Sequence, residues 1–89
     1  MPVRRKVVIH GRVQGVGFRW AVARAAETRG VAGWAQNRAD GTVEAAFEGE
    51  ADAVESLVRF SGEGPRGAVV ERVEVTEELP EGLTGFSVR

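Results

Sequence analysis

The side chains and loops of this sequence with the clearest potential for chemistry lie at residues 14–19 and at Asn37. Residues 14–19 place two glycines directly before a segment with helical spacing. Glycine adopts positive φ without strain, so such a turn can point several backbone N–H groups at one anion, and a helix start adds its unpaired N–H groups. Arg19 adds a full charge and a planar fork that fits phosphate oxygens. We therefore predict a phosphate-binding loop, which consists of Gln14, Gly15, Val16, Gly17, Phe18 and Arg19.

Asn37 is the candidate for a second role, the orientation of a water molecule. A side-chain amide can donate one hydrogen bond and accept another without taking a proton. That suits a substrate with an easy leaving group, such as an acyl phosphate, whose carboxylate needs no general acid. Phosphoryl transfer through a loose transition state depends mainly on positioning and charge stabilisation. We therefore expect Arg19 and Asn37 to be the catalytic residues, without a metal ion or cofactor.

Taken one at a time, these residues also have ordinary structural explanations. A glycine turn before a helix is common, and an isolated arginine such as Arg19 is usually a surface residue. Asn37 can begin a turn before Asp40. Phe18 is explained as a core residue, and Trp34 as a core residue or as a rim residue beside the site. His10 is the only histidine and there is no cysteine, so His-ligated metal pairs, His-based triads and thiolate nucleophiles are excluded.

The pattern of apolar residues predicts the elements that position these groups. We expect strands at 5–13, 31–37, from 43 and at 69–78, helices from 18 to a stop at Gly30 and from 50 to a stop at Gly62, a hairpin turn at Asp40-Gly41, and a short edge strand at 86–88. In the strand at 69–78, Val69, Val73 and Val75 should share one face. This order is that of the ferredoxin-like split βαβ sandwich (βαββαβ), an α+β fold with an antiparallel sheet and two helices on one face.

That topology has a consequence for the site. Right-handed crossovers make the first two strands parallel, with the third strand between them. The ends of the first two strands then open on the same edge of the sheet, so residues 14–19 and Asn37 should lie together.

Length and composition limit the classes of function. The 89 residues suffice for one domain, 1–89, with a shallow site. The net charge of -1 excludes a general attraction to nucleic acid or to anionic membranes, and the basic run Arg4-Arg5-Lys6 is assigned to the solvent-facing start of a strand. No apolar run approaches the roughly 20 residues of a membrane span or the roughly 7–15 of a secretory signal. We expect a cytoplasmic monomer without nucleic-acid or membrane partners.

Two longer motifs carry a resemblance to a known family. Residues 11–19 (GRVQGVGFR) and 33–37 (GWAQN) are similar to the two signatures of the acylphosphatase family, and residues 40–43 (DGTV) are similar to its hairpin. The resemblance covers nearly the whole chain. It differs at Gly17, a variable position of the family that holds glycine here instead of a bulkier side chain, and at Arg89, where the family often ends in an aromatic residue.

The resemblance implies hydrolysis of acyl phosphates to a carboxylate and inorganic phosphate, which would also be a competitive inhibitor. Arg19 would bind the phosphate, Asn37 would position the attacking water, and the backbone of residues 14–18 would form the cradle. Two alternatives stay open. The chain could be a carbamoyl-phosphate-handling domain, like acylphosphatase-like segments of larger hydrogenase-maturation proteins, or a non-catalytic phosphate- or RNA-binding ferredoxin-like module. An RNA-reading sheet needs exposed aromatic residues on its central strands, whereas we expect Lys6, Val8, His10, Thr42, Glu44 and Ala46 to point outward there.

Overall fold

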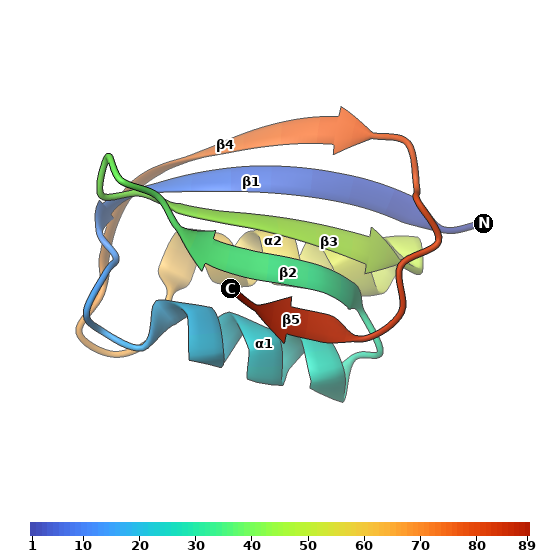
Figure 1. Ribbon diagram of the computed structural model, residues 1–89, viewed down its shortest axis with the longest axis horizontal. Helices are drawn as coiled ribbons and strands as arrows, with labels where there is room; N and C mark the ends of the chain where they lie inside the picture. Colours follow the sequence, from blue (N-terminus) through green and yellow to red (C-terminus); the bar gives the residue numbers. More distant parts are fainter.

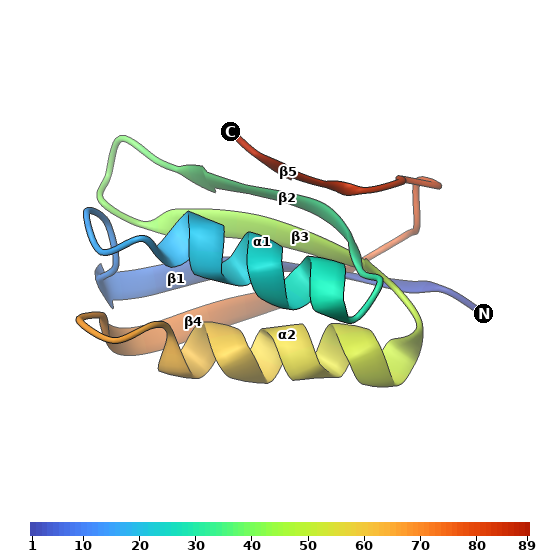
Figure 2. The same cartoon turned by 90° about the horizontal axis from the view of Figure 1, so that it is seen from below.

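The computed structural model describes residues 1–89 as a sheet covered on one face by two helices (Figures 1 and 2). The elements, in chain order, are β1 (Val3–Arg12), α1 (Phe18–Thr28), β2 (Ala32–Asn37), β3 (Val43–Gly49), α2 (Ala51–Glu63), β4 (Val69–Glu78) and β5 (Phe86–Val88). The predicted order of strands and helices and the ferredoxin-like fold are therefore confirmed.

The five strands lie in the order β4-β1-β3-β2-β5. All neighbours are antiparallel except β2 and β5, which run parallel at the edge. Because β3 is antiparallel to both β1 and β2, these two strands run in the same direction on either side of it. The loop that leaves β1 and the hairpin that leaves β2 accordingly lie at one end of the sheet (Figure 1). The two loops thus leave the sheet at the same end, as the topology predicts.

The core lies between the sheet and the two helices, because alternate side chains of the central strands point to the helical face. Its largest fully buried side chains include Phe18 from α1, Phe47 and Ile9 from the sheet, and Leu57 from α2. Phe47 also stacks on Phe86, with ring centroids 6.1 Å apart, and this contact fastens the short strand β5 to the core. Both helices thus bury an apolar face against the sheet.

Strand β4 differs from the prediction at its start. Val69 is exposed, whereas Val70 packs against the core with Val73. The cause is a β-bulge, because Gly11 pairs with Val70 while His10 pairs with Arg72, which leaves Glu71 as an extra residue. Gly11 has φ 130°, and a Cβ atom there would lie 2.1 Å from the Val69 carbonyl oxygen. Because of the bulge, the side chains that precede Glu71 point to the opposite face of the sheet from the one expected. The prediction that Val69 and Val73 share a face was therefore wrong.

Three residues expected at the surface are buried. Arg4 is 4% exposed and forms ion pairs with Glu48, Glu78 and Glu81, so it does not belong to a solvent-facing basic run. Ala46 lies on the face without helices yet has no exposed surface, because it is a small residue whose cross-strand neighbours are Lys6 and Trp34. Thr42 is also buried, and its hydroxyl donates a hydrogen bond to Asp40.

The structure excludes one of the two alternatives for Trp34 and corrects the predicted end of the second helix. Trp34 is half-buried on the open face, where the Arg89 guanidinium lies 4.5 Å above its ring, so it is not a core residue. Helix α2 continues through Gly62 to Glu63, and Gly64 is its C-cap residue, with a positive φ of 72° that glycine adopts without strain. Neither helix has the length and hydropathy required to cross a membrane.

Candidate active site

At two positions of the loop between β1 and α1, the backbone has a positive φ that only glycine adopts easily. Gly15 and Gly17 both have φ 76°, and Gly17 is the N-cap residue of α1. A Cβ atom at either glycine would meet nothing within 4 Å. The requirement for glycine here is thus conformational and not a lack of space.

The N–H groups of residues 15–20 form the second feature of this loop. None of them donates a hydrogen bond to a protein acceptor: the first bond that closes on α1 runs from Ala21 N–H to the Gly17 carbonyl, at 3.0 Å. No side chain caps the helix and no acidic residue lies in its first turn. We call residues 14–18 with the N–H groups up to residue 20 the cradle. Its unpaired donors and the positive end of the helix dipole favour an anion.

The apolar side chains of the cradle are anchored in the protein. Phe18 is 2% exposed and belongs to the core, and Val16 is half-buried against it. The two residues therefore offer backbone N–H groups to a ligand while their side chains hold the loop in place. Phe18 is therefore a core residue through its side chain, and its backbone N–H group still belongs to the cradle.

Arg19 lies in the first turn of α1 and reaches the end of β5. Its Nη1 donates to the Arg89 carbonyl oxygen at 2.5 Å, while the Arg89 N–H donates to the Ala35 carbonyl at 2.8 Å. The Arg89 side chain in turn stacks on Trp34. The guanidinium of Arg19 is thus held by a strand that is about 70 residues away in the sequence, and the remaining donors of its fork are not used by protein groups.

Asn37 is the last residue of β2 and pairs with Val43 of β3. It is exposed, and its side-chain amide makes no hydrogen bond to another protein group. The amide therefore keeps its donors and its acceptor for a water molecule or a ligand. No hydrogen bond joins it to Arg19.

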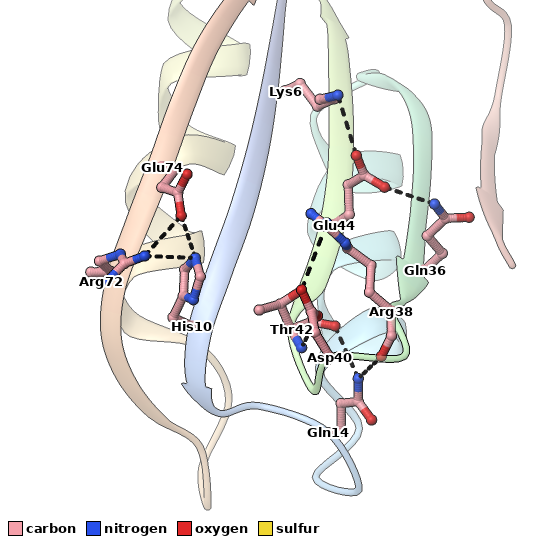
Figure 3. A network of polar contacts seen from close by, with 10 residues as sticks. All are labelled: Lys6, His10, Gln14, Gln36, Arg38, Asp40, Thr42, Glu44, Arg72 and Glu74. Atoms are coloured by element: carbon pink, nitrogen blue, oxygen red, sulfur yellow. Dashed lines mark hydrogen bonds and ion pairs between the residues drawn. The ribbon is translucent and has the colours of Figure 1, made fainter.

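Gln14 connects the cradle to the hairpin after Asn37 (Figure 3). Its Nε2 donates to the carbonyl oxygens of Arg38, at 2.8 Å, and Thr42, at 3.0 Å. Within the hairpin, an Asp40 oxygen accepts from the Thr42 hydroxyl at 2.6 Å and from its N–H at 3.0 Å. These hydrogen bonds from Thr42 lower the pKa of Asp40, which therefore stays ionised.

A residue pattern could not have identified two of these contacts. The bond from Arg19 to Arg89 and the bridge from Gln14 to the hairpin join residues that are far apart in sequence, and nothing in their spacing marks them. Gln14 is predicted as a member of the cradle, but the structure shows its side chain in contact with the hairpin. The structure contains no group of three or more His, Cys, Asp or Glu side chains arranged to hold a metal ion.

Comparison with known proteins gives one consistent family. The family model described as Acylphosphatase matches residues 5–88. An acylphosphatase of Thermococcus kodakarensis is 55% identical over 97% of this chain and 94% of the relative. The crystal structure of acylphosphatase from Bacillus subtilis superposes with a TM-score of 0.94, at 40% identity and 98% coverage of both chains. Full-length HypF in a phosphate- and nucleotide-bound form also has this fold (TM-score 0.89, 26% identity), but the match covers only 12% of that chain.

Proposed function

This chain belongs to the acylphosphatase family and is a hydrolase of acyl phosphates, and we propose that Arg19 and the cradle bind the phosphate while Asn37 orients the attacking water. The observation that carries the proposal is the run of unpaired N–H groups at residues 15–20, beside Arg19. Asn37 lies at the same end of the sheet, with an amide that no protein group uses.

In the proposed reaction, the water oxygen attacks phosphorus and the bond from phosphorus to the acyl oxygen breaks. The carboxylate leaves with the electron pair of that bond, and the proton of the water passes to a phosphate oxygen. Negative charge on the phosphoryl oxygens is stabilised by the N–H groups and by Arg19. Inorganic phosphate is then the product, and we expect it to compete with the substrate.

The remaining expectations belong to the same proposal. We propose that residues 1–89 act as one domain, as a monomer in the cytoplasm, on small acyl phosphates. The end-to-end match with acylphosphatases supports this assignment over a domain for carbamoyl phosphate, because the HypF match is confined to a small part of that protein.

The experiment compares two substitutions in an acyl phosphate hydrolysis assay. Arg19 meets the phosphate in both ground and transition states, so Arg19→Gln should raise KM and lower kcat together. Asn37 meets mainly the water, so Asn37→Ala should lower kcat by about 10²-fold or more and leave phosphate inhibition nearly unchanged.

The matched control is Arg29→Gln, which removes an exposed arginine at the opposite end of α1. It should leave both constants within twofold of the parent protein. Circular dichroism must first show that all variants are folded. An Asn37→Ala protein with a normal kcat, or one that fails only through weaker phosphate binding, would contradict the role of Asn37.

A further inference from the structure

We propose that Gln14 is a positioning residue that fixes Asn37 relative to the phosphate cradle, an inference that rests on the proposed role of Asn37. The Gln14 amide nitrogen has two N–H donors, and each is matched by one carbonyl oxygen, of Arg38 and of Thr42. The side chain thus joins the end of β1 to the hairpin between β2 and β3 (Figure 3).

Both carbonyl groups lie on the hairpin side of the Asn37–Val43 pair, one beyond each strand end. Arg38 directly follows Asn37, and Thr42 directly precedes Val43, the cross-strand partner of Asn37. The Thr42 carbonyl also accepts the Arg38 N–H at 2.9 Å. Gln14 therefore holds the last backbone bond of the β2–β3 ladder, next to the residue that presents the water.

The other bonds of the hairpin cannot serve this purpose. Asp40 binds Thr42, and the Gly41 N–H donates to the Arg38 carbonyl at 3.2 Å, so these bonds stay within the hairpin. They fix its shape but not its distance from the cradle. The two bonds from Gln14 are the hydrogen bonds that join residues 13–17 to residues 38–42.

Asn37 depends on this connection because its own amide has no protein partner to hold it. A displacement of about 1 Å in a positioned group can cost up to about 10²-fold in rate. Loss of the Gln14 bridge should consequently reduce the chemical step without changing how the cradle binds phosphate. A residue that contacts the phosphate directly would show the opposite pattern.

The experiment is a double-mutant cycle with Gln14→Met and Asn37→Ala in the acyl phosphate assay. Methionine keeps the length of the side chain and removes both donors. Gln14→Met should lower kcat by about 10-fold and leave the inhibition constant of inorganic phosphate within twofold. In the Asn37→Ala background the same substitution should change kcat by less than about twofold, because the group that it positions is already absent.

Gln36→Met is the matched control. The Gln36 side-chain amide donates a hydrogen bond to Glu44 at 2.8 Å, and the substitution removes this bond as well. Gln36 is next to Asn37 in the sequence but does not contact the cradle. Its kcat should stay within twofold of the parent protein. Amide hydrogen exchange gives an independent readout: the Arg38 N–H should exchange faster in Gln14→Met and not in Gln36→Met.

The outcomes separate this inference from the proposed function. A normal kcat for Asn37→Ala alone refutes the role of Asn37 itself. A slow Asn37→Ala protein in which Gln14→Met costs the same factor as in the parent refutes the positioning role of Gln14, as does weaker phosphate inhibition at unchanged kcat. If Gln14→Met does not fold, Gln14→Asn, whose amide is one methylene too short to reach both carbonyls, carries the same expectations.

Discussion

Two clusters of backbone N–H groups lie at opposite ends of the sheet and are used in opposite ways. At the end of β3, the Glu48 carboxylate accepts bonds from three successive N–H groups, of Glu81 at 2.8 Å, Gly82 at 2.7 Å and Leu83 at 2.9 Å. In the cradle, the N–H groups of residues 15–20 bond to no protein acceptor. One cluster is closed by an anion of the protein, and the other is left open to an anion from solution.

The closed cluster is built for structure. Glu48 and Arg4 are each about 5% exposed and paired with one another at 3.4 Å. Burial alone would raise the pKa of Glu48, but the three N–H donors and Arg4 outweigh it, so the pKa lies below its ordinary value. The bonds fasten the loop that leads into β5, the strand whose end holds Arg19. The closed cluster thus fixes the start of the segment whose end contacts Arg19, beside the cradle.

The largest expected effect comes from breaking the closed cluster with Glu48→Gln. The substitution removes the charge shared by three N–H groups and leaves Arg4 buried with less compensation. We expect a loss of about 3 kcal/mol in the free energy of unfolding, measured by urea denaturation. Glu55→Gln, an exposed position on α2, is the control and should cost little. A loss below about 1 kcal/mol would show that the cluster contributes little to stability.

The same residue predicts a pH dependence. Because the pKa of Glu48 is lowered in the folded state, its contribution is complete above the ordinary value of 4.5 and is lost as the pH falls from there through the folded pKa. The parent protein should therefore lose more stability on acidification than Glu48→Gln does. Parallel stability curves for the two proteins across this range would contradict the assignment.

The second prediction closes the open cluster by substitution. Gly17→Asp places a carboxylate at the N-cap of α1, where it competes with the phosphate for the N–H donors. The control is Gly17→Asn, which meets the same backbone strain at φ 76° without the charge. We expect kcat/KM of the Asp variant to fall about 10²-fold below that of the Asn variant in the hydrolysis assay. Equal activity would mean that no anion binds there.

The third prediction fills the open cluster with inorganic phosphate. Binding to the folded state alone at ten times its dissociation constant should add about 1.4 kcal/mol, or a rise in Tm of roughly 5–10 °C. Thermal denaturation at increasing phosphate concentration measures the effect. The rise should be largely absent in Arg19→Gln and unchanged in Arg29→Gln. An equal rise in Arg19→Gln would place the anion elsewhere.

The smallest effect is expected at the start of α2, a third set of backbone N–H groups. Here Glu50 accepts a bond from the Ala53 N–H at 3.3 Å, and Asp52 lies in the first turn. Glu50→Ala should cost about 0.5–1 kcal/mol of stability, because one N–H group loses its partner. We expect kcat and KM to stay within twofold, since this helix start is capped by the protein. A large loss of activity would contradict the division between capped and open helix starts.

Local patterns predicted the fold almost completely because its elements are locally encoded. The alternation of apolar residues, the stop at Gly30 and the Asp40-Gly41 turn gave each element to within a few residues. The prediction failed at Val69, where the bulge opposite Gly11 changes the facing of the strand. It also failed at Arg4, where three glutamates from two distant segments compensate a buried charge that composition alone assigns to the surface.

For this protein, the sequence by itself determined the family, the order of elements, and the candidate residues Arg19 and Asn37, since motif spacing and periodicity are local properties of the chain. Only the tertiary structure decided that Arg19 contacts the end of β5, that Gln14 bonds to the hairpin, and that Glu48 closes one N–H cluster while the cradle stays open. The physical reason is that a hydrogen bond depends on distance and direction in space. For partners tens of residues apart, both are set by how the strands are ordered and bulged in the sheet.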